Sequence, residues 1–386
     1  MPTEAALTTV SKKGLTPLSP TPPLSTPADI ASRRILRLAL GTALSLAFSQ
    51  IAAWQLSFLA PIFTLVLLAT PMPAPTLKSG IKLVLALLLP LFLGALTLLP
   101  FLEYLRPVGV LLVALALFYS FYFTSRGGAA VLGTFMTMGL TLVVTIGSVS
   151  IDMLSAVAQG LALGAIFGLL FVSLAHALLP DLKTSALAAQ APSPPAKPAL
   201  NEARRKALRA LLITFPMTFL FLLSSASISY VAVMIKVAAM GQQASVDSSR
   251  EMGRSMLEST LWGGLGAVIA WQVLSIWPAL LMYSLLITLA GLLFGSRIFQ
   301  GQGMHPKFSM WSYAYLTMIV VLAPALLDSQ SGSAAGAAFY FRLLLFVVIA
   351  VYGSIAVAVF DAFWPAATGQ GSEESVAQKV DDLRAG

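Results

Sequence analysis

Long apolar segments, separated by short polar stretches, run through most of the chain. Each approaches the roughly 20 residues that a helix needs to cross the hydrocarbon core of a membrane. A strand would leave unpaired backbone groups in lipid, so we expect every span to be a helix. The pattern predicts an all-α polytopic membrane protein of about twelve transmembrane helices, near 35–53, 54–70, 82–99, 107–123, 128–147, 153–179, 207–224, 226–240, 258–274, 277–295, 308–327 and 339–364.

The polar residues around these spans occur twice, at first 172 positions apart and later with small insertions between them. Each copy holds six spans, an even number, so both copies begin on the same side of the membrane. We therefore expect two parallel repeats related by a pseudo-two-fold axis along the membrane normal. The corresponding residues include Arg33 and Arg205, Arg34 and Lys206, Arg37 and Arg209, Lys78 and Arg250, Lys82 and Arg254, Ser120 and Ser296, Thr137 and Thr317, and His176 and Asp361.

The repeat divides the chain into five parts. Residues 32–180 and 203–365 are the two six-span repeats, and the Pro-rich stretch 181–202 is a cytosolic linker. Residues 1–31 are polar and Pro-rich, without the compact apolar core of a cleaved signal peptide, so we expect a disordered cytosolic tail. Residues 366–386 form a polar cytosolic tail.

Composition supports the membrane assignment, because 58% of the residues are hydrophobic and only 10% are charged, against about 25% charged in soluble domains. The net charge of +8 comes from basic residues that flank the apolar spans, so no nucleic-acid partner is expected. The chain has no cysteine, and its two histidines are far apart. We expect no cofactor and no metal site.

The distribution of basic residues predicts the orientation. With both termini in the cytosol, all but three of the 23 Lys and Arg residues lie on the cytosolic side or at span ends, the exceptions being Arg106, Lys236 and Arg342. This asymmetry is the positive-inside pattern of a multi-pass protein. No phosphate-binding loop, nucleophile elbow or metalloprotease motif is present. We therefore expect no catalytic residues, and a protein that moves a solute and is not an enzyme.

Lys236 is the charge placed deepest in a predicted span. A buried ammonium is costly unless it is paired or hydrated, so Lys236 could attract a substrate carboxylate or a permeating anion. The alternative is that its side chain reaches the cytosolic headgroups, because the span ends near Gly241. The corresponding residue of the first repeat is Thr64, and this asymmetry favours a function.

Asp361 and His176 occupy corresponding positions near the cytosolic ends of the last span of each repeat. A carboxylate and an imidazole can take up and release protons in a proton-coupled cycle. Alternatively, they are interfacial polar residues that precede the helix-ending prolines Pro365 and Pro180.

Two basic pairs, Lys78 with Lys82 and Arg250 with Arg254, have the spacing of neighbours on one helix face. They can bind phospholipid headgroups, or form a positive vestibule that collects anionic substrates. We expect salt bridges within the second repeat, between the arginines and Asp247, Glu251 and Glu258.

Hydroxyl residues recur at helical spacing in the fifth and eleventh spans, where Thr137 and Thr317 correspond. Ser120 and Ser296 are a second corresponding pair, in the fourth and tenth spans. Such residues can line a polar pathway, although hydrogen bonds between helices are the alternative explanation.

The chain resembles the fusaric-acid-resistance and aromatic-acid-exporter family, and in particular a short branch of unknown function. The resemblance covers roughly residues 32–365. It rests on the basic clusters at Arg33 to Arg37 and Arg204 to Arg205, and on the basic starts of the third spans, which lead into small-residue stretches at Gly94-Ala95 and Gly266-Ala267. Longer members carry a large cytosolic domain that this chain lacks between its repeats.

The resemblance implies an inner-membrane pump of Gram-negative bacteria that expels aromatic carboxylic acids with a periplasmic adaptor of the membrane-fusion type. Related plant proteins are anion channels with basic pore residues, a role that would suit Lys236 and Arg254. We expect a proton-coupled efflux transporter for small amphipathic or aromatic organic acids. Whether the chain forms a homo-oligomer is left open by the sequence. The predicted pathway residues are Lys236, Arg250, Arg254, Thr137, Thr317, Ser120 and Ser296, with Asp361 or His176 linked to protons. An anion channel and a non-transporting scaffold subunit are the competing interpretations.

Overall fold

The computed structural model describes residues 26–54, 56–70, 72–181, 199–223, 230–246, 252–301, 303–330 and 335–364. Within these ranges the protein contains twelve α-helices, ten of which are long and apolar enough to cross a membrane. The prediction of an all-α polytopic membrane protein is confirmed. The helices are α1 (Pro27–Ala52), α2 (Leu59–Leu68), α3 (Leu77–Tyr104), α4 (Arg106–Ser125), α5 (Ala130–Leu142), α6 (Ile151–Leu178), α7 (Leu200–Leu223), α8 (Val231–Val246), α9 (Met252–Ile276), α10 (Leu280–Ile298), α11 (Phe308–Gln330) and α12 (Ala335–Phe363).

Several helices begin one or two turns before the predicted apolar spans, because polar residues cap them there. Thr26 and Asp29 form a capping box at the start of α1, in which each side chain accepts a hydrogen bond from the backbone N–H of the other residue. Thr76 caps α3 and Ser150 caps α6 in a similar way. Hydropathy marks the part of a helix that lies in lipid, and the capping residues mark where the helix starts.

Helix α2 is much shorter than its predicted span. The ten residues of α2 cover about 15 Å at 1.5 Å per residue, about half of the roughly 30 Å hydrocarbon core. The chain turns back sharply between α1 and α2, with Ala53 and Leu56 in the left-handed region at φ 48° and 62°. Helices α1 and α2 pack against each other after this turn, but residues 54–70 do not form the predicted full-length span. Helix α8 has 16 residues, and it begins and ends later in the chain than the predicted span 226–240.

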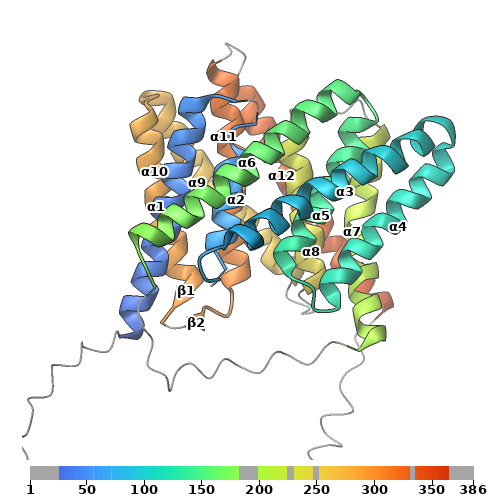
Figure 1. Cartoon of the computed structure of the whole chain (residues 1–386), viewed down its shortest axis with the longest axis horizontal. Coiled ribbons are helices and arrows are strands. Elements are labelled where there is room, and N and C mark those ends of the chain that lie inside the picture. The colour runs from blue at the N-terminus through green and yellow to red at the C-terminus, as the bar shows by residue number, and fades with distance from the viewer. Residues whose placement is uncertain are drawn as a thin grey trace, which may run out of the picture.

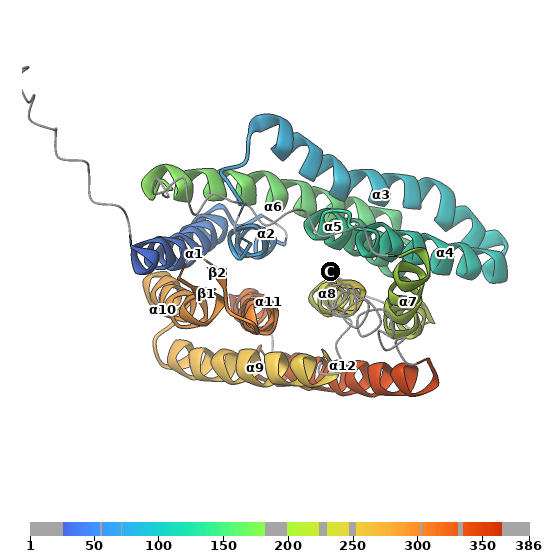
Figure 2. The ribbon, with the colours of Figure 1, turned by 90° about the horizontal axis from the view of Figure 1, so that it is seen from below.

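Helices α2, α5, α8 and α11 lie innermost in the bundle (Figure 2). Helix α1 packs against α10 on one side of this group, and α4 packs against α7 on the other. Helices α3 and α6 cover one face, and α9 and α12 cover the opposite face (Figure 2). The predicted two-fold repeat relates α1 to α7 and α4 to α10, so it also relates the α1–α10 contact to the α4–α7 contact. The boundaries of the repeats stay a prediction.

Burial separates the inner helices from the outer ones. Residues 231–245 of α8 are all buried, whereas α3 exposes a stripe of large apolar side chains that includes Leu85, Leu89, Phe92 and Leu96. A soluble protein rarely exposes so much continuous apolar surface. The outer surface is therefore suited to lipid, and a lipid bilayer is the partner that the transmembrane helices imply.

Two local features were not predicted from the sequence. The fifth span changes from α-helix to a π-helical turn, η1 (Val143–Gly147), and a two-stranded hairpin of β1 (Phe299–Gln300) and β2 (Gly303–Met304) joins α10 to α11. Thr141 and Thr145 donate hydrogen bonds to the backbone one turn earlier, a local pattern that competes with regular helix geometry. The hairpin lies at the same end of the molecule as the start of α1 (Figure 1).

Candidate transport site in the membrane interior

Helix α8 carries four polar side chains that are buried inside the helix bundle. Its first part is an apolar run with the single charge Lys236, and Gln242, Gln243 and Ser245 follow in its last turns. The helix packs against α4 and α5 on one side, and against α7, α11 and α12 on the other. Polar groups of the two predicted repeats therefore come into contact through α8.

Lys236 is buried and bonds inside the protein. The residue is only 4% exposed, and its Nζ donates a hydrogen bond of 2.8 Å to Thr317 Oγ1 on α11. The Thr317 hydroxyl donates its own proton to the carbonyl oxygen of Tyr313 at 2.7 Å, so it can only accept from Lys236. The amine also lies 6.0 Å from the ring centroid of Phe346 on α12. This position differs from the alternative in which the side chain reaches the headgroups.

The surroundings of Lys236 offer partial compensation for its charge. One hydroxyl and one aromatic ring face attract an ammonium group, but much less than a carboxylate does. Within the ranges that the structure describes, no carboxylate forms an ion pair with Lys236. A buried cation of this kind favours the approach of an anion, because the anion would supply the missing charge.

A second polar cluster joins α4, α5 and α8. Thr137 donates to the Gly133 carbonyl at 2.9 Å, and its Oγ1 accepts from Gln242 Nε2 at 2.6 Å. The Ser120 hydroxyl lies 2.8 Å from the same oxygen and is its remaining donor. All three side chains are nearly fully buried. The structure therefore brings together Ser120 and Thr137, which the sequence proposed, with Gln242, which it did not.

Gln242 escaped the sequence analysis because it follows the predicted end of its span near residue 240. Two adjacent glutamines directly after an apolar run were the available signal. The structure continues α8 to Val246, which places Gln242 and Gln243 inside the bundle. Gln243 Nε2 donates to Ser255 Oγ on α9 at 3.3 Å, so the two amides contact different neighbours.

Other predicted pathway residues lie apart from these clusters. Ser296 is exposed, and its hydroxyl donates to the Leu293 carbonyl of its own helix at 2.8 Å. Arg254 is also exposed and pairs with Glu258 at 2.6 Å, with Lys307 3.4 Å from the same carboxylate. The predicted salt bridge between Arg254 and Glu258 is confirmed. Arg250 lies outside the described residues.

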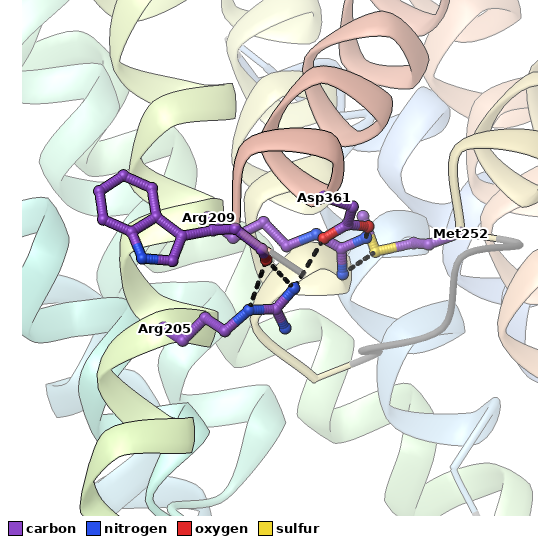
Figure 3. Close-up of polar contacts among 5 residues, drawn as sticks. Arg205, Arg209, Met252 and Asp361 are labelled. Atoms are coloured by element: carbon purple, nitrogen blue, oxygen red, sulfur yellow. Dashed lines mark hydrogen bonds and ion pairs between the residues drawn. The ribbon is translucent and has the colours of Figure 1, made fainter. Parts of the chain in front are cut away.

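Asp361 lies between two arginines at the end of α12 (Figure 3). Arg205 pairs with Asp361 Oδ1 at 3.0 Å, and Arg209, which is fully buried, pairs with Oδ2 at 2.5 Å. Arg205 also donates to the backbone oxygen of Trp364 through Nε and Nη2, at 3.0 and 2.6 Å. The carboxylate thus ties the start of α7 to the end of α12.

The corresponding arginines of the first repeat hold the end of α6 by different means. Arg33 donates to the Pro180 carbonyl at 3.1 Å, and Arg37 donates to the Leu179 carbonyl and to Asp181. His176, which corresponds to Asp361, instead places Nδ1 2.9 Å from the Val172 carbonyl. The basic cluster at the start of each predicted repeat therefore binds the end of that repeat's last helix, a role that was not predicted from the sequence. The signal in the sequence that could have indicated this role is that the second repeat contains both a basic cluster at its start and the carboxylate of Asp361 at its end.

Fold and interior define the chain as a multi-pass membrane protein. Residues 34–175, which extend from the start of α1 almost to the end of α6, match a family model described as a protein of unknown function (DUF2955). No curated protein and no solved structure matches the chain. No named relative therefore links it to the fusaric-acid-resistance family. Among the described residues, no group of three or more His, Asp or Glu side chains could hold a metal ion.

Proposed function

We propose that the protein transports small amphipathic or aromatic organic anions across the membrane, and that Lys236 is the positive group that the anion meets on its way. The observation that carries this proposal is the burial of the Lys236 amine between α8 and α11, with the hydroxyl of Thr317 as its hydrogen-bond partner. An evolved membrane interior keeps such a charge at a cost in stability, which favours a role in binding an anionic solute.

The polar groups on α8 suggest how the solute would pass. The amine of Lys236 would offset the charge of the anion, while the hydroxyls of Thr317, Thr137 and Ser120 and the amide of Gln242 would replace its lost water contacts. Lys236 of α8 contacts Thr317 on α11, whereas Gln242 of the same helix contacts Thr137 on α5. A movement of α8 against α5 and α11 would therefore open both clusters together.

The interior around Lys236 is packed, since every residue in 231–245 is buried. Two cavities, of about 170 and 500 Å³, lie nearer the helix ends and are lined by other residues. The proposal therefore includes a conformational change between this packed state and a state in which the solute reaches Lys236. Arg250 and Arg254 would collect anions at the cytosolic side.

For the proton-linked group, the contacts favour His176 over Asp361. Protonation of Asp361 would remove its ion pair with the fully buried guanidinium of Arg209, and breaking a buried ion pair is costly. The Nε2 atom of His176 is buried and has no hydrogen-bond partner among the described residues. It can accept a proton without breaking an ion pair.

We further propose the bacterial inner membrane as the location, with both termini in the cytosol, on the strength of the charge asymmetry and the family resemblance. Export with a periplasmic adaptor protein of the membrane-fusion type rests on the resemblance alone. Transport, and not catalysis, is the activity that the buried cation supports.

The test is flux of radiolabelled benzoate into proteoliposomes that contain the full chain, with an imposed proton gradient at fixed membrane potential. The expected result is accumulation that a protonophore abolishes. Flux that follows the membrane potential and ignores the proton gradient would favour an anion channel. Absence of flux for benzoate and for a panel of other aromatic acids would contradict the proposal and leave the scaffold interpretation.

A further inference from the structure

A cavity of about 500 Å³ lies where α7 begins and α12 ends, beside α4. Its volume falls within the range of about 300–1,000 Å³ that is usual for ligand pockets. Since α4 belongs to the first predicted repeat and packs against α7 of the second, the cavity lies at a contact between the repeats (Figure 2). Its lining includes Phe118 of α4, Arg204, Arg205 and Leu208 of α7, and Phe360 and Trp364 at the end of α12.

The lining is charged near the helix ends and apolar further in. Arg204 lies in the second turn of α7, and Trp364 directly follows the last residue of α12. Leu208 lies one turn further into α7, and Phe360 lies one turn back into α12. A molecule that binds here would therefore have its charged end at the helix ends and its apolar part along the helices.

Arg204 supplies the charge that is available to a ligand. Arg205 is already engaged, because it pairs with Asp361 at 3.0 Å and its guanidinium carbon lies 5.6 Å from the ring centroid of Phe360. Among the described residues, no carboxylate lines the cavity or pairs with Arg204, which is exposed. The cavity therefore favours a ligand whose head carries a negative charge.

The apolar side of the cavity continues into the lipid-facing surface. Leu212, one turn beyond Leu208 on α7, is 47% exposed, and Tyr119, next to Phe118 on α4, is 60% exposed. Both helices are long and apolar enough to cross a membrane. Trp364 is exposed at the end of α12, and tryptophan is enriched at the level of the lipid headgroups. The charged end of the cavity thus lies at the headgroup level, and its apolar end faces acyl chains.

These properties distinguish an anionic phospholipid from related ligands. Inorganic phosphate needs polar partners around its whole surface, but Leu208, Phe118 and Phe360 offer none. A zwitterionic phospholipid has the same acyl chains, but its head carries a positive charge that the arginines repel. Basic pockets between transmembrane helices are a known type of site for anionic headgroups.

The first repeat also has a cavity at the corresponding end, but its lining differs. Arg34 and Arg37 of α1 line that cavity together with the carboxylate of Asp181. The residue that corresponds to Arg204 is Ser32, which lies outside that lining. The two cavities therefore differ in their chemistry, and only the lining of the larger one includes Arg204.

We infer that the cavity between α4, α7 and α12 binds an anionic phospholipid, with the phosphate at Arg204 and the upper part of an acyl chain against Leu208, Phe118 and Phe360. The ion pair of Arg205 with Asp361 stays intact, because the ligand uses the neighbouring arginine. The bound lipid contacts helices of both predicted repeats and so stabilises their contact at this end of the bundle. The inference is independent of the solute that the protein transports.

The experiment is native mass spectrometry of the purified full-length chain in detergent, titrated with palmitoyl-oleoyl phosphatidylglycerol or with phosphatidylcholine of the same chains. The first phosphatidylglycerol is expected to bind at least about fivefold more tightly than phosphatidylcholine, because one basic residue near an anionic lipid has about that effect. Equal affinities would overturn the inference. An excess of inorganic phosphate is expected to leave the bound lipid in place. Displacement by phosphate would indicate a site for a soluble anion and would overturn the lipid assignment.

Arg204→Gln tests the headgroup contact. It is expected to weaken phosphatidylglycerol binding by about fivefold and to leave phosphatidylcholine binding unchanged. Arg106→Gln is the matched control, because it removes the same charge from an exposed position at the other end of α4, outside the cavity. It should bind both lipids as wild type does. Wild-type affinity in Arg204→Gln, or equal losses in the two variants, would contradict a specific site.

Leu208→Trp tests the acyl-chain contact, because the larger ring fills the apolar part of the cavity and both arginines remain. It is expected to lose the tight binding of phosphatidylglycerol. Leu220→Trp adds the same ring at an exposed position further along α7 and should retain that binding. Wild-type affinity in a folded Leu208→Trp protein would contradict the inference, since charge alone would then hold the lipid. If Leu208→Trp does not fold, the comparison of Arg204→Gln with Arg106→Gln decides.

Discussion

Arg209 is the largest fully buried side chain that carries a charge, and its position depends on Asp361. Asp361 accepts from two guanidinium groups at once, so one substitution removes both ion pairs (Figure 3). Removing one partner of a buried ion pair is costly because the other charge stays buried and loses its counter-charge. At the scale of single residues, the ion pair of Arg209 with Asp361 is therefore expected to stabilise the fold more than any exposed ion pair.

Asp361→Asn is expected to lower the free energy of unfolding by about 3 kcal/mol, measured by denaturant titration in mixed micelles. Glu258→Gln is the matched control, because it removes a carboxylate that pairs with the exposed Arg254 and Lys307. Exposed pairs contribute about 0–1 kcal/mol. An Asp361→Asn variant that is as stable as wild type but loses its response to a proton gradient would contradict the structural role.

How far the sequence predicted single residues depends on what kind of signal each one leaves. Lys236 could be identified because one charge in an apolar run is conspicuous, and Thr317 because its hydroxyl recurs in the repeat. Their 2.8 Å hydrogen bond could not be predicted, since 81 positions of chain separate them. Ser296 shows the opposite case, because its repeat partner Ser120 is buried and bonded while Ser296 faces outward.

At the scale of elements, close packing of α2 against α6 is possible because α6 presents glycines to it. A Cβ atom built on Gly168 would lie 2.8 Å from Phe63 Cβ and 3.3 Å from the Ala60 carbonyl oxygen. A Cβ on Gly164 would lie 2.8 Å from Leu59 Cβ. These contacts involve backbone and Cβ atoms, which cannot rotate away, so any larger residue must push the two helices apart.

Gly168→Ala is therefore expected to destabilise the protein by about 1–3 kcal/mol, the usual cost of overpacking, despite the better helix propensity of alanine. Gly336→Ala on α12 is the control, because a Cβ there would meet nothing within 4 Å. That variant should be neutral or more stable by up to about 1 kcal/mol. Thermal unfolding in detergent measures both, and a Gly168→Ala protein at least as stable as wild type would contradict the packing.

The sequence predicted long lipid-facing helices better than buried ones. For α3, α6 and α12 the apolar pattern and the structure agree, because hydrophobicity is what a lipid-facing helix requires. For α2 the same hydrophobicity reflects burial among other helices, so the pattern overestimated its length. The turn at Ala53 to Leu56 and the π-helical turn at 143–147 arise from local geometry that hydropathy does not report.

At the scale of the whole molecule, the basic starts of α1 and α7 lie at the same end of the bundle (Figure 1). The contacts α1–α10 and α4–α7 link the chain segments before and after the linker on both sides of the inner helices. The positive-inside pattern predicts that this end faces the cytosol.

The orientation can be measured by cysteine labelling, because the chain has no natural cysteine. Asn201→Cys lies at the start of α7, and Val149→Cys lies before α6, at the opposite end from the Arg37 contacts of Leu179. Both positions are exposed. An impermeant thiol reagent added to spheroplasts is expected to label Val149→Cys and to spare Asn201→Cys. The reverse pattern would contradict the predicted orientation.

The central claim is that the buried amine of Lys236 attracts the transported anion. The most direct measurement compares benzoate flux into proteoliposomes for Lys236→Met and for Lys78→Met, which removes the same charge from an exposed position at the start of α3. Flux is expected to fall by at least about tenfold in Lys236→Met, since loss of one favourable charge interaction of about 1.4 kcal/mol already has that effect. Flux in Lys78→Met should stay near that of wild type. A folded Lys236→Met protein that transports benzoate at the wild-type rate would contradict the account.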